Sequence, residues 1–211
     1  MRVRGRTFQL AVKNVCDRVL SVLILGLLAP FLLGITLAVI LQSGWPAIFV
    51  QTRVGRDGRS FKVYKFRTMV LGASDKGLMT TVAENDDRIT RVGTFLRKWS
   101  LDELPQLVNV LKGDMSLIGP RPTLEYQVSQ YTPRQRRRLE VKPGITGWAQ
   151  VNGRNMLPWA RRIELDLWYV DNFTLWLDAK ILFRTIRVFL RREGLYGQGG
   201  VNDDFGTKRN L

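Results

Sequence analysis

The stretch VLSVLILGLLAPFLLGITLAVIL, residues 19–41, decides the architecture of this 211-residue chain. Its 23 residues are almost wholly apolar, and no charged residue occurs between positions 19 and 52. At about 1.5 Å of rise per residue, one helix of this length can cross the ~30 Å hydrocarbon core of a bilayer. The run is too long for a cleavable signal peptide and lacks a small-residue cleavage site. We therefore expect a membrane anchor joined to one further domain.

Pro30 stands at the midpoint of this run, with eleven residues on either side. Proline removes a helix hydrogen bond and clashes with the preceding turn, so we expect a kink near Ala29. One interpretation is a transmembrane helix that tolerates its proline. The other is a re-entrant helix-break-helix, whose two ends lie on the same side of the membrane.

Basic residues flank the apolar run on both sides. Those before it are Arg2, Arg4, Arg6, Lys13 and Arg18, and those after it are Arg53, Arg56, Arg59, Lys62, Lys65 and Arg67. Lysine and arginine near a membrane segment favour the cytoplasmic side, and here both flanks do so with nearly equal force. A helix that enters, bends at Pro30 and leaves by the same face satisfies both, so the sequence favours the re-entrant topology.

The composition restricts the chemistry. The chain has no histidine and a single cysteine, Cys16. A Ser-His-Asp triad, a Cys-His dyad, a histidine-based zinc site and an intrachain disulfide are therefore excluded. The net charge of +15 predicts anionic partners: nucleic acid, phospholipid or phosphorylated substrates. Only charge favours nucleic acid, because the sequence resembles neither an RNA-binding platform nor a zinc finger, so we expect no nucleic-acid partner.

Residues 97–122, RKWSLDELPQLVNVLKGDMSLIGPRP, concentrate the candidate catalytic side chains. Asp102 and Glu103 begin a predicted helix, Asp114 follows in a turn, and Arg121 lies between two prolines. Acids, a cation and rigid turns this close together are typical of a phosphate-and-metal site. Alternatively, Ser100 and Glu103 form an S-x-x-E capping box whose acids only complement the helix dipole. The residues alone leave both interpretations open.

The remaining segments complete a mostly helical α/β fold. Residues 47–54 and 60–67 alternate apolar and polar side chains around a Gly-Arg-Asp-Gly turn, which predicts a β-hairpin. We expect a loop or short helix over 71–91, helices over 92–99, 100–111, 125–140 and 158–192, and a loop over 142–154. The aromatic and cationic side chains of 158–192 suit either a membrane interface or a buried core with a solvated basic face. The predicted organisation is an anchor over 1–45, one catalytic domain over 46–196 and a mobile tail over 197–211.

Three long motifs in order resemble one family. QTRVGRDGRSFKVYKFRTM at 51–69, RITRVGTFLRKWSLDELPQLVNVLKGDMSLIGPRP at 88–122 and KPGITGWAQVNGR at 142–154 are similar to the bacterial sugar transferases, the monotopic polyprenyl-phosphate phosphoglycosyl transferases. The resemblance implies a small catalytic domain on a re-entrant helix at the cytoplasmic face of the bacterial inner membrane. This family often carries Ser-Pro at the helix break, whereas this chain has Ala29-Pro30.

The resemblance also implies a reaction and its partners. The expected enzyme uses Mg²⁺ to move a sugar-1-phosphate from a UDP-sugar to undecaprenyl phosphate, releases UMP and initiates exopolysaccharide or other surface-glycan synthesis. A covalent phosphosugar intermediate maps onto Asp102, beside Glu103 as the second catalytic residue. Glu103 and Asp114 are the expected metal ligands. The expected substrate-binding residues are Lys65, Arg67, Arg97, Pro120, Arg121, Pro122, Gln150 and Arg154, with Arg121 at the nucleotide end. The anionic bilayer is a further partner, and a homodimer is one option for the oligomeric state.

Two other functions fit parts of the sequence. A non-enzymatic basic adaptor on a membrane surface would use the same anchor and helices but leaves the SLDELPQL and GPRP motifs unexplained. A glycosyltransferase that releases UDP commonly uses a DxD metal site, and neither Asp86-Asp87 nor Asp102-Glu103 has that spacing. The released nucleotide distinguishes the two enzymes: the phosphoglycosyl transferase releases UMP, and the glycosyltransferase releases UDP. The sequence does not specify which sugar is transferred.

Overall fold

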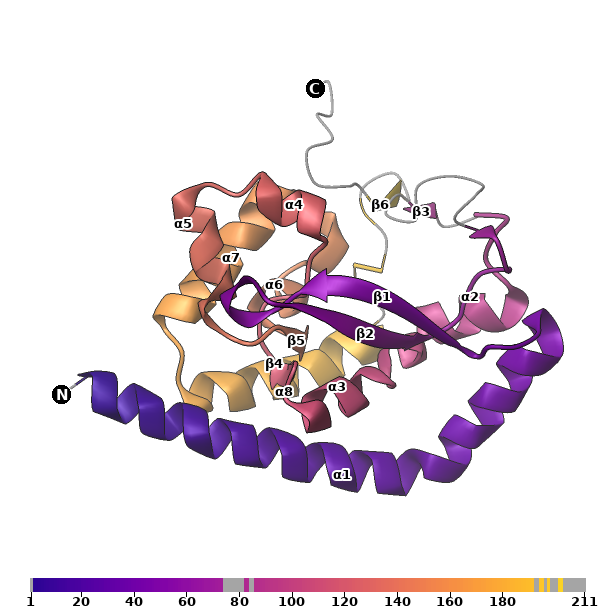
Figure 1. The fold of residues 1–211 in the computed structure, drawn as a ribbon, viewed down its shortest axis with the longest axis horizontal. Helices are drawn as coiled ribbons and strands as arrows, with labels where there is room; N and C mark the ends of the chain where they lie inside the picture. The colour runs from indigo at the N-terminus through magenta and orange to yellow at the C-terminus, as the bar shows by residue number, and fades with distance from the viewer. Residues whose placement is uncertain are drawn as a thin grey trace.

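The computed structural model describes residues 2–73, 82–83, 86–191, 194–195, 197 and 201–202, with backbone alone at 2–6, 82 and 201–202. It is mostly helical, with a small antiparallel hairpin and one long apolar N-terminal helix, as predicted. Figure 1 shows this helix along one side of a domain built from short helices and strands. Apart from residues 197 and 201–202, the predicted tail lies outside the described residues, as does part of the predicted 71–91 loop.

Helix α1 (Arg2–Ser43) contains Pro30 and is continuous through it. The helix is not interrupted at Pro30, but it does bend: its long N-terminal part and its C-terminal part run at an angle to each other (Figure 1). The re-entrant topology itself stays a prediction. A proline inside a helix removes one hydrogen bond, and bending accommodates it while the flanking turns remain intact. Thr7–Ser43 is long and apolar enough to cross a membrane, and only 11% of its most apolar window is buried within the protein.

The N-terminal part of α1 is fixed to the domain by a buried polar cluster. The Lys13 ammonium lies 2.5 Å from the Asp178 carboxylate and 3.7 Å from that of Asp17. Ser116 donates a hydrogen bond of 2.7 Å to Asp17, and the Tyr169 hydroxyl donates one of 2.7 Å to Asp178. All five side chains are buried. Charges removed from water require such pairing, so this cluster specifies how α1 lies on the domain.

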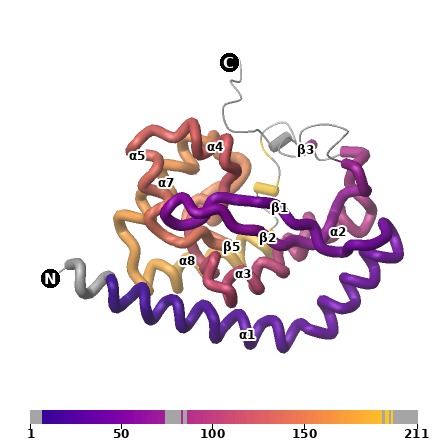
Figure 2. The backbone as a smooth tube through the Cα atoms, viewed as in Figure 1, coloured from indigo at the N-terminus to yellow at the C-terminus, as the bar shows by residue number. Residues whose placement is uncertain are grey.

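The other end of α1 packs through apolar contacts. Ile35 and Val39 join Ala47, Phe66 and Leu96 in one buried cluster. These residues connect α1 to the hairpin and to helix α2 (Arg91–Lys98), which lies beside the end of α1 (Figure 2). The long helix is therefore attached to the domain at both of its ends.

The predicted hairpin is confirmed. Strand β1 (Ile48–Val54) pairs antiparallel with β2 (Ser60–Phe66), with Phe49 opposite Lys65 and Val54 opposite Ser60. The short helix η1 (Arg56–Gly58) makes the turn, in which Asp57 and Gly58 have positive φ. Because side chains alternate along a strand, Phe49, Gln51 and Arg53 share one face of β1.

Several other predicted segments are subdivided. The helix expected over 100–111 is a short η3 (Leu101–Glu103) followed by α3 (Gln106–Lys112). The segment 125–140 holds α4 (Glu125–Ser129), α5 (Pro133–Arg136) and η4 (Arg137–Glu140). The expected 142–154 loop contains β5 (Gly144–Thr146) and α6 (Trp148–Val151), before η5 (Arg154–Met156). The segment 158–192 is two helices, α7 (Trp159–Asp171) and α8 (Leu175–Arg191). Two further strands of two residues each, β3 (Val82–Ala83) and β6 (Val201–Asn202), pair antiparallel with each other.

Close backbone contact brings two of the sequence motifs together. Strand β4 (Ser116–Ile118) runs parallel to β5, with Ile118 opposite Thr146. A Cβ on Gly144 would lie 2.1 Å from the Gly119 nitrogen, and one on Gly147 would lie 2.1 Å from the Gly119 oxygen. Only glycine permits this approach. The contact fixes the start of the Pro120–Pro122 turn, which carries Arg121.

The two interpretations of 158–192 apply to different faces. Tyr169 and Phe173 are buried, in contact with Ile118 and Ile181. Trp176 and Phe183 on α8 are 79% and 74% exposed. The helices therefore supply both a buried aromatic core and an exposed apolar surface.

We predict that Lys13→Met lowers the free energy of unfolding by about 3 kcal/mol, because it leaves the buried Asp17 and Asp178 without their cation. Chemical denaturation in detergent micelles measures the change. Lys180→Met, at an exposed position of α8, is the control and should change stability by less than about 0.5 kcal/mol. Equal stability of the two variants would show that the buried cluster does not hold α1.

Candidate active site

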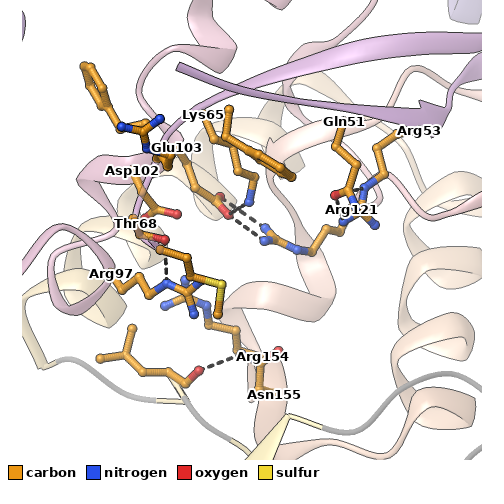
Figure 3. A pocket seen from close by; sticks show the side chains of 15 residues that line it. Gln51, Arg53, Lys65, Thr68, Arg97, Asp102, Glu103, Arg121, Arg154 and Asn155 are labelled. Atoms are coloured by element: carbon orange, nitrogen blue, oxygen red, sulfur yellow. Dashed lines mark hydrogen bonds and ion pairs between the residues drawn. The ribbon is translucent and has the colours of Figure 1, made fainter. Parts of the chain in front are cut away.

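A polar cavity of about 230 Å³ lies between the hairpin, η3 and the Pro120–Pro122 turn (Figure 3). It brings together five of the predicted cations and both adjacent acids. Its lining residues are Phe49, Gln51, Arg53, Lys65, Phe66, Arg67, Thr68, Met69, Arg97, Asp102, Glu103, Arg121, Arg154, Asn155 and Leu195. The segments that supply them are far apart in the sequence, so the cavity exists only in the folded chain.

Glu103 is the central carboxylate of the cavity. Its Oε1 lies 2.8 Å from the Lys65 ammonium and 2.5 Å from one Arg121 nitrogen, and its Oε2 accepts a hydrogen bond of 3.1 Å from the other. The side chain is buried, with 7% of its surface exposed. Figure 3 shows the Lys65 and Arg121 side chains converging on this carboxylate.

The capping-box interpretation is wrong. Ser100 has the left-handed φ of 51°, and its side chain makes no capping hydrogen bond. Instead, its hydroxyl accepts a hydrogen bond of 3.0 Å from Arg154. Since Glu103 is paired with Lys65 and Arg121, the S-x-x-E spacing reflects the cavity and not a helix cap.

Electrostatics distinguish Glu103 from its neighbour. Burial by itself would raise the pKa of Glu103, but the charges of Arg121 and Lys65 and the Arg121 hydrogen bonds hold that pKa well below its usual value. Burial lowers the pKa of the Lys65 ammonium, and Glu103 opposes that change. Glu103 is therefore ionised and neutralised by its neighbours.

Asp102 has the opposite character. Its half-buried carboxylate lines the cavity and forms no hydrogen bond or ion pair within the described part of the chain. Burial raises its pKa above the ordinary value, and the adjacent Glu103 acts in the same direction, whereas Lys65 opposes the rise. A carboxylate without a fixed partner, facing a cationic cavity, is available to react with an electrophile.

The Pro120–Pro122 turn that carries Arg121 is fixed from behind. Arg138 donates a hydrogen bond of 2.7 Å to the Arg121 carbonyl oxygen and forms a buried ion pair of 2.6 Å with Asp166 on α7. The Tyr131 hydroxyl accepts another hydrogen bond from Arg138, at 2.7 Å. This support is preorganised, because both charged partners are almost fully buried. The three residues are absent from the predicted site, since their role is visible only in the packing.

Other predicted cations reach the cavity from different elements. Arg97 donates a hydrogen bond of 2.8 Å to Thr68. Arg67 donates to the Ser43 carbonyl oxygen at 2.8 Å and also to the Gly44 carbonyl oxygen, so it caps the C-terminus of α1. Helix α1 and the cavity therefore share one side chain.

The structure adds polar residues that the sequence interpretation missed. Gln51 and Arg53 line the cavity from β1, where the Gln51 side-chain oxygen accepts hydrogen bonds of 2.6 and 3.1 Å from Arg53. Thr68 and Asn155 also line it. The alternation of side chains along β1 could have identified them from the sequence. It places Gln51 and Arg53 on the same face of the strand as Phe49, and Phe49 pairs with the predicted residue Lys65.

The remaining predicted residues lie elsewhere. Pro120 and Pro122 frame Arg121 but line a smaller hollow behind it. Gln150 lines an adjoining apolar groove. Asp114 does not line the cavity; it follows Gly113, the residue that ends α3. A Cβ atom placed on Gly113 would be within 4 Å of the Arg18 and Lys142 side chains, so this end of α3 lies among other residues. Within the described ranges, no group of three or more potential metal-ligating side chains occurs.

Comparisons with known proteins place these features in a family. The sequence model of the bacterial sugar transferase family matches residues 8–192. The chain is 52% identical to the "Uncharacterized sugar transferase EpsL" of Bacillus subtilis, over 76% of this chain and 78% of that protein. It is 45% identical to the "Undecaprenyl-phosphate galactose phosphotransferase" of Salmonella typhimurium, over 87% and 41%. It is 48% identical to the "UDP-glucose:undecaprenyl-phosphate glucose-1-phosphate transferase" of Escherichia coli, over 82% and 39%. The match thus spans about two fifths of the last two proteins.

We predict that neutralising the two adjacent acids changes stability in opposite directions. The pKa of Glu103 is lower in the folded protein than in the unfolded chain, where it is about 4.3. The ionised carboxylate therefore stabilises the fold fully above pH about 4.3, and this stabilisation is lost as the pH falls through the pKa of the folded protein. Glu103→Gln should therefore lower the free energy of unfolding by about 1–3 kcal/mol at pH 7, and by less near pH 4. The raised pKa of Asp102 makes its ionised form unfavourable as the pH rises, so Asp102→Asn should raise the melting temperature at pH 7.

Thermal unfolding in detergent at pH 7 and near pH 4 measures both effects. Asp114→Asn, outside the cavity, is the matched control and should leave the melting temperature unchanged. A shift of the same sign for Asp102→Asn and Glu103→Gln at pH 7 would contradict the assigned electrostatics.

Proposed function

Because this chain belongs to the bacterial sugar transferase family, we propose that it transfers a sugar-1-phosphate from a UDP-sugar to undecaprenyl phosphate, with release of UMP. The names of two relatives support this donor and acceptor chemistry. The observation that carries the proposal is the unpaired Asp102 carboxylate beside a Glu103 that Lys65 and Arg121 neutralise. Such a reaction would initiate the synthesis of a surface glycan.

The proposed first step uses Asp102 as the nucleophile. An Asp102 oxygen attacks the phosphorus that carries the sugar, and the bond from that phosphorus to the oxygen of UMP breaks. UMP leaves with the electron pair of that bond, and a phosphosugar remains on Asp102. In the second step an oxygen of the lipid phosphate attacks the same phosphorus. The bond to Asp102 breaks, which regenerates the carboxylate and forms a lipid diphosphate sugar.

The cations of the cavity make this attack feasible. A diphosphate repels an approaching carboxylate until its charge is compensated. Arg97, Arg121 and Arg154 line the cavity with Lys65 and supply fixed positive charge around Asp102. The ion pairs of Glu103 hold Lys65 and Arg121 at the cavity before substrate binds. The acceptor phosphate is ionised near neutral pH and requires no strong base.

Mg²⁺ is the metal that we propose for this reaction, with Glu103 as its protein ligand. Mg²⁺ in proteins commonly uses one or two carboxylates and completes its coordination with water and substrate phosphates, so a single carboxylate in this cavity is compatible with it. Because Lys65 and Arg121 contact both oxygens of Glu103, the metal would have to displace at least one of these cations from the carboxylate. When bound, it would supply positive charge to the diphosphate. The position of Asp114 outside the cavity gives no support to the second predicted ligand.

We propose that α1 is re-entrant and that the domain lies on the cytoplasmic face of the bacterial inner membrane. Exposed apolar side chains on two helices support membrane contact: Val19, Val22, Leu23, Leu27, Leu33, Leu37 and Leu41 on α1, and Trp176, Phe183, Ile186 and Leu190 on α8. The contacts of α1 with the domain near both of its ends support a helix that returns to the same side. The basic flanks point in the same direction.

We predict that Asp102→Asn abolishes transfer, by at least about a thousandfold, since the amide keeps the shape but loses the nucleophile. Incubation with radiolabelled UDP-sugars and no lipid should trap labelled phosphosugar, but not labelled uridine, on the parent protein. Peptide mapping should assign the label to Asp102. Glu103→Gln should also inactivate the enzyme and weaken its dependence on Mg²⁺. Near-normal turnover by a folded Asp102→Asn protein, or release of UDP, would refute this reaction.

We predict that the two ends of the apolar run lie on the same, cytoplasmic side. Single cysteines near Arg4 and near Arg59, in a protein without Cys16, should both react with a membrane-impermeant reagent from that side only. Pro30→Leu should straighten α1, allow some molecules to span the bilayer and reduce activity. If the site near Arg4 in the parent reacts only from the periplasmic side, α1 is a single transmembrane span.

A further inference from the structure

A second cavity, of about 310 Å³, adjoins the polar one and has a different chemistry. It is a groove between α1, α3, β5 and α8, walled mainly by apolar side chains. Among them are Ile24 on α1, Leu107 on α3, Ile145 on β5, and Leu182, Val188 and Phe189 on α8. Leu182 and Phe189 are 42% and 40% exposed. The groove is therefore continuous with the exposed apolar surface of α8, which we assign to the membrane.

The two cavities share a polar wall. Glu103, Arg121 and Arg154 line both the groove and the polar cavity, and Ser100, the partner of Arg154, lines the groove beside them. The groove consequently has an apolar side that continues into the exposed surface of α8 and a cationic end at Glu103, the neighbour of the proposed nucleophile in the polar cavity. That combination fits an amphiphile with one anionic head and a long hydrocarbon chain.

Gln150 supplies an independent indication of a ligand in the groove. The nitrogen and the oxygen of its side-chain amide are both buried, and neither has a hydrogen-bond partner among the residues that the structure describes. A buried amide without partners is destabilising, and folded proteins rarely retain one without a reason. Gln150 has no role in the attack by Asp102, so its unpaired amide points to a polar group that binds here.

We propose that the groove is the acceptor site: the isoprenoid chain of the lipid phosphate lies along α3 and α8, and its phosphate meets Gln150, Arg121 and Arg154. This proposal rests on the proposed function and adds to it the place of the second substrate. UDP-sugar and lipid phosphate then approach Asp102 from opposite sides of the Glu103–Arg121 pair. Two separate sites allow UMP to leave before the lipid reacts.

Val188→Trp tests the groove by filling it, and Ile186→Trp is its control on an exposed, membrane-facing position of α8 outside the groove. We expect Val188→Trp to raise the KM for undecaprenyl phosphate at least about tenfold, or about 1.4 kcal/mol, because part of the apolar chain loses its binding surface. Its release of UMP from UDP-sugar without acceptor should stay within about twofold of the parent rate. Ile186→Trp should match the parent in both measurements.

A binding measurement separates this proposal from the proposed reaction. A photoreactive prenyl phosphate, added to the protein in nanodiscs, should crosslink to α3 and α8 in the parent but not in Val188→Trp. If this pattern holds while no UDP-sugar yields UMP, the groove is correct and the proposed reaction is wrong. If UMP is released and Val188→Trp retains the parental KM and crosslinks, the acceptor site lies elsewhere and the groove assignment is overturned.

Gln150→Leu tests the polar end. The substitution should raise the KM for undecaprenyl phosphate severalfold and reduce the preference for the phosphate over undecaprenol. It should also raise the melting temperature, because it removes an unpaired buried amide. A lower melting temperature together with an unchanged preference would show that Gln150 is only a packing residue.

Discussion

The ion pairs of Glu103 are the interaction on which the candidate site depends. One buried carboxylate joins β2, η3 and the Pro120–Pro122 turn through Lys65 and Arg121. Removing Lys65 or Arg121 would leave the buried Glu103 carboxylate with less compensation for its charge, which is less favourable than the paired arrangement. The same pairing keeps Glu103 ionised and leaves Asp102 as the carboxylate without a fixed partner. Position in this charge network, and not residue type, thus separates the roles of the two adjacent acids.

The candidate site is also connected to helix α1 through buried side chains. Arg67 lines the polar cavity and caps the C-terminus of α1, and the Lys13–Asp178 pair fixes the other end of the helix. A change in the angle of α1 would therefore strain both buried contacts. In the proposed membrane orientation, the angle of α1 and the geometry of the cavity would therefore be coupled, which suits the proposed reaction between one water-soluble and one lipid substrate.

The shared wall between the polar cavity and the apolar groove gives this coupling a chemical use. Arg121 and Arg154 border both spaces, so in the proposed reaction the same cations would neutralise the donor diphosphate and afterwards the acceptor phosphate. An intermediate on Asp102 would connect the two events without requiring both substrates at once. One set of positive charges would then serve both proposed steps, which is compatible with the small size of the domain.

The sequence by itself determined the elements whose signals are local. The apolar run with Pro30, the alternation of β1 and β2, the Asp102-Glu103 pair and the three family motifs were all readable without coordinates, and all five cations predicted to bind substrate line the cavity. Only the tertiary structure decided which groups meet. Glu103 pairs with residues 38 and 18 positions away, so of the two interpretations that the sequence left open, the helix cap is replaced by an ion-pair network. The folded chain likewise placed Asp114 outside the cavity, added Gln51 and Arg53, and left the Gln150 amide unpaired in a groove. Periodicity and capping signals extend over a few residues, whereas burial and charge pairing depend on segments that only the folded chain brings together.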